Sequence, residues 1–151
     1  PAARSQASAV YASRDGLVYM FGGLPDTGVL GDMWSYEPAT AVWTEIRPSG
    51  PLPSPRVGGC LVYDPVNETL VLFGGTGSGA RPPAGGGQYE GVMGDTWIYD
   101  TKSNVWTELA ASGPSPRAYA AMAYDPESDS VVLFGGYGSD GPLGATWELS
   151  F

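Results

Sequence analysis

The sequence contains no histidine and only one cysteine, Cys60. Histidine is the commonest general base and the commonest metal ligand, so a Ser-His-Asp site and a histidine-bound metal are both excluded. A single cysteine cannot form a disulfide within the chain. Cys60 lies in the run VGGCLVYD, whose apolar and small residues predict a buried, unreactive thiol.

Basic residues and long apolar runs are also scarce. Seven Lys and Arg residues face 16 Asp and Glu residues, which gives a net charge of −9. Such a surface repels a phosphate backbone, so nucleic acid is not an expected partner. No apolar run approaches the roughly 18 residues of a membrane helix, so no membrane insertion is expected. Glycine (23 residues) and proline (14 residues) are abundant instead, and their even spread indicates a globular chain with many turns.

The chain repeats one pattern three times. Arg4, Arg56 and Arg117 each precede by 17 residues the phenylalanine of a double-glycine motif, in LVYMFGG, LVLFGG and VVLFGG. A tryptophan follows each glycine pair, and in two copies a second tryptophan follows nine residues later. The units span approximately 4–55, 56–116 and an incomplete 117–151. The repeated positions predicted to be structural are Gly22, Gly23, Gly74, Gly75, Gly135, Gly136, Trp34, Trp43, Trp97, Trp106, Trp147, Arg56 and Arg117.

Each complete unit predicts four short strands. The apolar run before the glycines is typical of a strand buried on both faces. DMWSYE and DTWIYD alternate polar with apolar residues, VWTE opens with β-branched and aromatic residues, and the segment after Pro-x-Pro-Arg ends at an Asp-Pro turn. One unit cannot bury both faces of its sheet, so the units must stack. Stacked four-stranded antiparallel sheets form an all-β fold, the β-propeller.

The apolar run, the glycine pair and a tyrosine and tryptophan with six residues between them (Tyr36 and Trp43; Tyr99 and Trp106) resemble the kelch repeat. The resemblance covers essentially the whole chain. It implies a propeller of about five to seven blades, with the double-glycine strand nearest the central channel and an N-terminal strand that completes the last blade. The third copy departs from the pattern, with Leu149 at the tyrosine position and no second tryptophan.

Three blades make an open arc with two exposed apolar flanks, and two arrangements cover them. Either the 151 residues are part of a longer propeller ring, or two copies close a six-bladed ring as a homodimer. A dimer leaves two of its blades one strand short, which favours the longer propeller. The first residue, Pro1, is not methionine and no signal peptide pattern follows, which indicates a processed product or a piece of a longer chain.

Residues that recur in every unit are expected to be scaffold. Asp32 and Asp95 are expected to accept hydrogen bonds from loop amides near the glycine pairs, and Ala145 takes their place in the third unit. The three arginines are expected to reach neighbouring blades or loop carbonyls, and the tryptophans to pack between blades. Glu45 and Glu108 are expected on a solvated strand face.

One feature is not repeated. The loop after the second glycine pair, 76–94, has 19 residues, whereas its counterpart 24–31 has eight. It shares one end of the blades with 47–56, 111–117 and 137–144, and it carries residue types that interfaces favour. A binding surface is therefore predicted there, and a glycine-rich insertion without a ligand is the alternative. The predicted binding residues are Arg81, Gln88, Tyr89, Glu90, Met93, Tyr137 and Asp140.

The predicted function is a non-catalytic propeller scaffold that binds another protein, or another copy of itself, through this loop face and the blade edges. No cofactor, metal or catalytic residue is predicted. The alternative is the propeller portion of a larger secreted carbohydrate-active or oxidase enzyme, with its catalytic residues outside this chain. The glycosylation pattern at Asn67 and turns similar to those of prokaryotic kelch proteins favour an extracellular or surface location, with the cytoplasm as the alternative.

Overall fold

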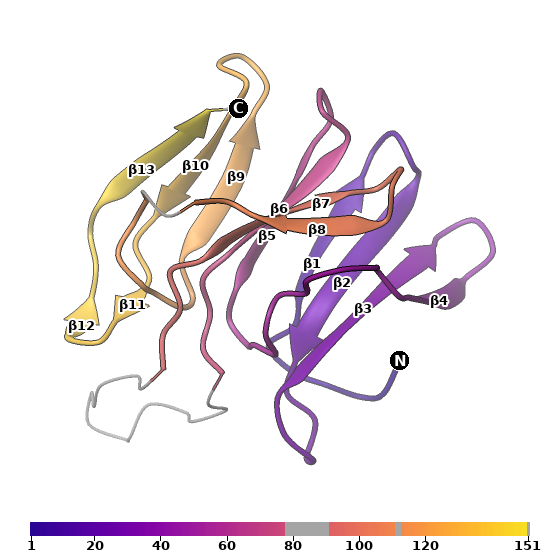
Figure 1. Ribbon diagram of the computed structural model, residues 1–151, viewed down its shortest axis with the longest axis horizontal. Helices are drawn as coiled ribbons and strands as arrows, with labels where there is room; N and C mark the ends of the chain where they lie inside the picture. Colours follow the sequence, from indigo (N-terminus) through magenta and orange to yellow (C-terminus); the bar gives the residue numbers. More distant parts are fainter. Residues whose placement is uncertain (78–90, 111–112, 151) are drawn as a thin grey trace.

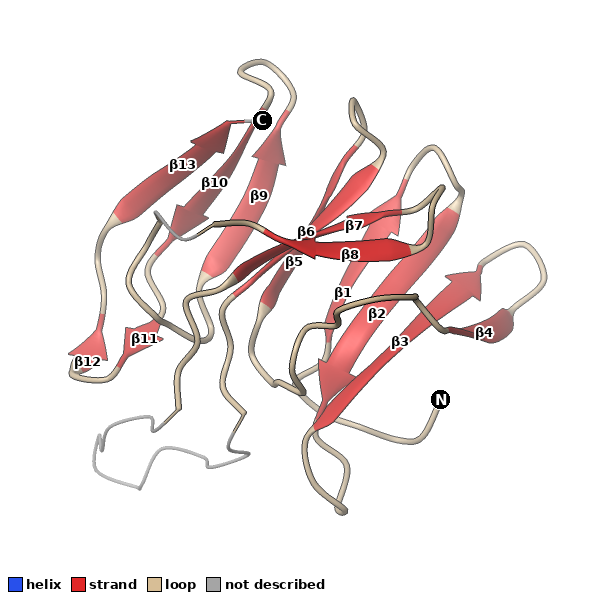
Figure 2. Cartoon of the chain, in the orientation of Figure 1, coloured by secondary structure: helices blue, strands red, loops and turns tan. Residues whose placement is uncertain are grey.

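The computed structural model describes residues 1–77, 91–110 and 113–150. Within these ranges all regular structure is β-strand, with thirteen strands. Figure 2 shows the strands in red. In the same part of the chain, no helix has the length and apolar character needed to cross a membrane. The predicted all-β class is confirmed.

The first two blades are complete four-stranded antiparallel sheets, with their strands in chain order. The first blade consists of β1 (Ser8–Ala12), β2 (Leu17–Gly23), β3 (Leu30–Glu37) and β4 (Val42–Ile46). The second consists of β5 (Cys60–Asp64), β6 (Thr69–Phe73), β7 (Thr96–Asp100) and β8 (Val105–Glu108). Both match the four strands that the repeat predicts.

The third blade has three strands, in the order β13-β10-β9. They are β9 (Ala121–Asp125), β10 (Ser130–Phe134) and β13 (Thr146–Ser150). A small hairpin that the sequence did not predict, β11 (Tyr137–Gly138) and β12 (Gly141–Pro142), lies between β10 and β13. The three blades lie side by side in an open arc (Figure 1).

The first strand of each blade lies at the inner edge of the arc. Neighbouring blades approach most closely through β1, β5 and β9. Ser8 Oγ donates to Gly59 O at 2.6 Å, and Cys60 Sγ to Ala120 O at 3.0 Å, so these edges are also hydrogen-bonded to each other. The expectation from the family resemblance is thus wrong on two points. The double-glycine strands β2, β6 and β10 are second from the axis, and β1 belongs to its own blade rather than completing the last one.

Small residues lie at the points where the inner edges are hydrogen-bonded to each other, at Ser8 and Gly59 and at Cys60 and Ala120. Bulky side chains fill the wider outer gap. The Trp106 ring, on the outermost strand of the second blade, lies 5.7 Å from the Phe21 ring of the first blade.

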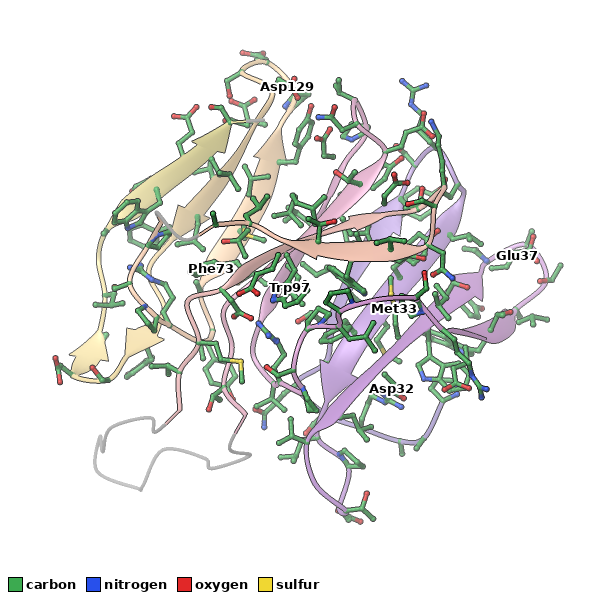
Figure 3. All side chains as sticks on the ribbon, in the orientation of Figure 1. Asp32, Met33, Glu37, Phe73, Trp97 and Asp129 are labelled. Atoms are coloured by element: carbon green, nitrogen blue, oxygen red, sulfur yellow. The ribbon has the colours of Figure 1, made fainter. Side chains whose placement is uncertain are left out.

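The core consists of two layers between blades. Tyr19, Phe21 and Met33 from the first blade pack against a larger set from the second: Leu61, Tyr63, Leu70, Leu72, Trp97, Tyr99 and Trp106. Figure 3 labels Met33 and Trp97 in this layer. The layer between the second and third blades is built on Val62, Val71 and Val131. Its buried side chains are smaller, and the third blade has no described strand that corresponds to β8 and its Trp106.

Candidate functional site

The longer connections of the three blades leave from one end, which we call the loop face. It comprises residues 24–29, 47–59, 76–77, 91–95, 113–120 and 135–145. The loop between β2 and β3 and the β11–β12 hairpin lie in the lower part of Figure 1. Backbone hydrogen bonds tie each Pro-x-Pro-Arg segment across the preceding blade. Gly23 N donates to Arg56 O at 3.0 Å, and Gly75 N donates to Arg117 O at 2.9 Å. The loop face therefore stands on a rigid frame.

Behind the loop face, the first two blades each hold an aspartate between an arginine and a tryptophan. In the second blade, Arg56 Nη1 donates to Asp95 Oδ1 at 2.8 Å, and Nη2 donates to Oδ2 at 2.7 Å. Trp97 Nε1 donates to the same Oδ2 at 2.7 Å. We call this arrangement the carboxylate clamp.

The first blade repeats the carboxylate clamp with Arg4, Asp32 and Trp34. The guanidinium and the indole are the side-chain donors to Asp32 and Asp95, a role that the sequence did not predict. Each carboxylate also accepts a hydrogen bond from the backbone amide of its own residue, rather than from an amide of a glycine pair. A charged acceptor stabilises a guanidinium that is 1% exposed, as in Arg56, and a carboxylate matches the two parallel N–H groups at its edge. The arginines also donate to glycine-pair carbonyls, such as Gly74 O at 3.0 Å, which confirms the expected contact with loop carbonyls.

Loss of the carboxylate at Asp95 is expected to destabilise the chain. Burial favours a higher pKa for Asp95, but the hydrogen bonds and charge of Arg56 and the hydrogen bond from Trp97 outweigh burial and lower it. A lowered pKa means that the clamp stabilises the fold above about pH 4, and that this stability is lost as pH falls through the folded-state pKa.

We expect Asp95→Asn to cost about 2–3 kcal/mol in the free energy of unfolding at pH 7, because Arg56 is left buried without its charge partner. The difference from the parent chain should shrink below about pH 4. Urea unfolding between pH 3 and 7 measures both effects. The control is Glu45→Gln, which removes an exposed pair with Arg47 and should cost less than about 0.5 kcal/mol. Equal costs for the two variants would contradict the clamp.

Three equivalent residues follow the arginines by two positions: Gln6, Gly58 and Tyr119. Gly58 and Tyr119 lie on the loop face, and Gln6 lies beside it, just before β1. All three have left-handed backbones, with φ of 58°, 61° and 58°. Gly58 N donates to Gln6 O, and Tyr119 N donates to Gly58 O. The Tyr119 hydroxyl also donates to Gln6 Oε1, which links the third blade to the first. We call this set the rim triad.

The rim triad has an unusual backbone conformation. A left-handed backbone is strained for Gln6 and Tyr119, and such strain concentrates at binding sites. A Cβ atom at Gly58 would lie 2.5 Å from the Tyr119 ring, so a larger residue there would displace that ring. Sequence reasoning missed this set. The sequence did contain one indication: the position two residues after the repeat arginine carries a different residue in each of the three units.

The predicted binding residues divide into two groups. Arg81, Gln88, Tyr89 and Glu90 lie outside the described residues. Met93, Tyr137 and Asp140 lie on the loop face, as predicted, and their binding role stays a prediction.

The three described binding residues occupy different places on the loop face. Met93 Sδ lies 3.5 Å from Ser54 Oγ. Tyr137 is 40% exposed and pairs through its backbone with Ala118. Asp140 lies exposed in the turn of the β11–β12 hairpin. No contact among the described residues brings these three side chains together.

Among the tryptophans, Trp97 and Trp106 are buried between blades, as predicted, whereas Trp43 and Trp147 are 39% and 40% exposed. Glu45 and Glu108 are exposed, which confirms the solvated strand face. The prediction of a buried thiol is also confirmed, since burial raises the pKa of Cys60 to about 11. In the described ranges, no three His, Cys, Asp or Glu side chains are grouped so that they could hold a metal ion.

A family model described as the KLHDC2/KLHL20/DRC7 Kelch-repeats domain matches residues 6–151. The chain belongs to the kelch-repeat family. The match covers all three blades, including the third, which lacks the tyrosine and the second tryptophan. Kelch repeats generally serve as protein-interaction modules.

The kelch chain is similar to segments of much longer proteins. It is 29% identical over 134 residues to Tip elongation aberrant protein 1 of Schizosaccharomyces pombe, which covers 87% of this chain and 11% of that protein. It is 28% identical over 136 residues to Rho GTPase-activating protein gacHH of Dictyostelium discoideum, covering 90% and 8%. It is 31% identical over 88 residues to human Host cell factor 1, covering 58% and 4%. The kelch chain thus spans about a tenth or less of the length of these relatives.

Proposed function

We propose that this kelch chain is a non-catalytic scaffold that binds another protein through its loop face. The observation that carries the proposal is a set of exposed apolar and aromatic side chains on hydrogen-bonded loops. Leu52, Tyr119 and Tyr137 are 51%, 38% and 40% exposed, and all three lie on the loop face. Side chains of this kind are typical anchors of protein interfaces.

The rigidity of the loops favours binding. An interface loses affinity when loops must become ordered on association. Here Ala118 N donates to Tyr137 O, and Tyr137 N donates to Ala118 O, so the hairpin is fixed to the third blade. The segment 55–57 is paired with the first blade through Arg56 N and Leu30 O. Tyr137 and Tyr119 are thus presented with little ordering cost.

The test compares substitutions of two exposed residues on the loop face with a substitution of an exposed residue at the opposite end of the blades. The immobilised chain is incubated with a lysate of the cells that produce it, and captured proteins are quantified by mass spectrometry. We expect the double variant Leu52→Ser with Tyr137→Ser to reduce recovery of a specific partner about tenfold or more. Val66→Ser, at a 60% exposed residue of the β5–β6 turn, should leave recovery unchanged. Equal recovery by the two variants would overturn the proposal.

The blade flanks are the second surface in this proposal. Tyr11 and Trp43 of the first blade are 54% and 39% exposed, and Phe134 of the third blade is 55% exposed. Phe134 occupies the repeat position of Phe21, which is covered by the next blade. Large apolar side chains exposed on the flank of a blade favour a second sheet packed against that flank. This sheet would come from further blades or from a second copy of the chain. Light scattering distinguishes a monomer of 15.7 kDa from a species of twice that mass.

A further inference from the structure

The third blade has the donors of a carboxylate clamp but not its carboxylate. Ala145 stands at the position of Asp32 and Asp95, two residues before the tryptophan of the blade. Its methyl group is exposed and cannot accept a hydrogen bond. Arg117 and Trp147 occupy the positions of the arginine and tryptophan of the other two clamps. The donors are thus retained where the acceptor is missing.

The guanidinium of Arg117 is held as in the second blade. Arg117 Nε donates to Ser115 O at 3.0 Å, Nη2 to Ser115 Oγ at 2.9 Å and Nη1 to Gly135 O at 2.9 Å. Arg56 makes the same three contacts with Ser54 and Gly74. These contacts account for three of the five N–H groups of an arginine. The two that remain, one on each Nη, are those that Arg56 directs at Asp95, and no described residue accepts them from Arg117.

The indole supplies a third donor. Trp34 Nε1 and Trp97 Nε1 each donate to the clamp aspartate at 2.7 Å. Trp147 Nε1 has no hydrogen-bond partner in the described ranges, and its side chain is 40% exposed. Trp147 is therefore accessible from outside the blade, whereas Arg117 is only 2% exposed.

A buried guanidinium without a charged acceptor is unfavourable. Burial lowers the pKa of Arg117, since nothing in the described part of the chain offsets the loss of hydration. The two complete clamps show which group satisfies these donors, a carboxylate with one oxygen on each Nη. The two oxygens of a carboxylate match the two Nη donors of the guanidinium better than a single spherical anion does.

We propose that Arg117 and Trp147 form a carboxylate-binding site at the loop face of the third blade, which receives an aspartate or glutamate side chain of a bound protein. The source of the carboxylate rests on the proposed function, whereas the site itself does not. The net charge of −9 limits nonspecific attraction of acidic proteins, so the local donors select the ligand. The backbone frame that fixes Ser115 and Gly135 keeps the guanidinium oriented before the ligand arrives.

The site is tested with sodium acetate as the probe, against sodium chloride at equal ionic strength. Two-dimensional ¹H–¹⁵N spectra resolve the indole N–H groups, and Trp147→Phe assigns the signal of Trp147. We expect acetate to shift the Trp147 indole signal in a saturable manner. The signals of Trp34 and Trp97 should not move, because their N–H groups already donate to carboxylates. A Trp147 signal that ignores acetate, or equal shifts of all five indoles, would overturn the site.

Ala145→Asp supplies the carboxylate from within the chain. We expect this variant to shift the Trp147 signal in the absence of acetate, to abolish the acetate response, and to raise the folding equilibrium constant about tenfold. Ala145→Asn has nearly the same shape without the charge and should raise it less than about threefold. If the two variants stabilise the chain equally, charge complementarity is wrong and the site fails.

The same variant separates the two proposals. In the lysate capture experiment, Ala145→Asp should reduce recovery of the loop-face partner about tenfold, because the site is already filled. If the wild-type chain captures the partner through Leu52 and Tyr137 while Ala145→Asp captures it equally well, the partner's carboxylate is not used. The inference then fails and the proposed function stands. If acetate shifts the Trp147 signal but the chain captures no partner through the loop face, the carboxylate-binding site stands and the proposed function fails.

Discussion

Gly74→Ala is expected to lower the free energy of unfolding by about 3 kcal/mol, whereas Gly135→Ala should cost only about 1 kcal/mol. The two residues are the first glycines of equivalent pairs and have nearly equal backbones, with φ of 65° and 71°. A left-handed alanine is strained at either position by about 1 kcal/mol. The difference lies in what covers them. A Cβ atom on Gly74 would overlap the carbonyl oxygen of Arg117, whereas on Gly135 the nearest atom, Leu143 O, is 3.4 Å away.

Urea unfolding of the two variants measures the difference directly. Gly22→Ala is the second test, since its Cβ atom would overlap the carbonyl oxygen of Arg56 in the same way, and its cost should match that of Gly74→Ala. The urea dependence of the unfolding free energy should stay unchanged, which shows that the native state is compared with a similar unfolded state. Equal costs at Gly74 and Gly135 would mean that the glycines serve only backbone conformation and not the approach of the next blade.

The strands could be predicted because three copies of one pattern mark the same positions. The apolar runs before the glycines became β2, β6 and β10, and the Asp-Pro clusters became the turns after β5 and β9. Their order from the axis could not be predicted from burial. Every residue of β5 is buried, and so are four of the five residues of β6. A pattern of hydrophobicity cannot distinguish an inner strand from its neighbour when both are covered on two faces.

The carboxylate clamp was only half predictable. The repeat identifies Asp32 and Asp95 as scaffold, but Arg4 is 28 residues from Asp32, and Arg56 is 39 residues from Asp95. Pairing over such distances depends on how the blade closes, which no local pattern reports. Ala145 is visible in the sequence as an exception. That Ala145 leaves a buried arginine without a carboxylate acceptor depends on where the Arg117 guanidinium lies, and only the folded chain defines that position.

Trp106→Ala is expected to cost about 3–5 kcal/mol in the free energy of unfolding, whereas Trp43→Ala should cost about 1 kcal/mol. Both tryptophans are the second residue of the outermost strand of a blade, at the same repeat position. Trp106 is 1% exposed, with its ring centroid 5.7 Å from that of Phe21 and 5.1 Å from that of Tyr99. Trp43 is 39% exposed and lies on the free flank of the first blade, where the described residues provide no facing sheet.

A third variant separates packing from hydrogen bonding. Trp106 Nε1 is buried and has no partner among the described residues, so Trp106→Phe removes a polar group that the fold does not satisfy. We expect Trp106→Phe to recover more than half of the stability lost in Trp106→Ala. Far-ultraviolet circular dichroism during urea unfolding is the measurement, because tryptophan fluorescence changes with the substitution itself. If Trp106→Phe is as destabilising as Trp106→Ala, the indole N–H contributes to the fold and the interface between the first two blades is not held by packing alone.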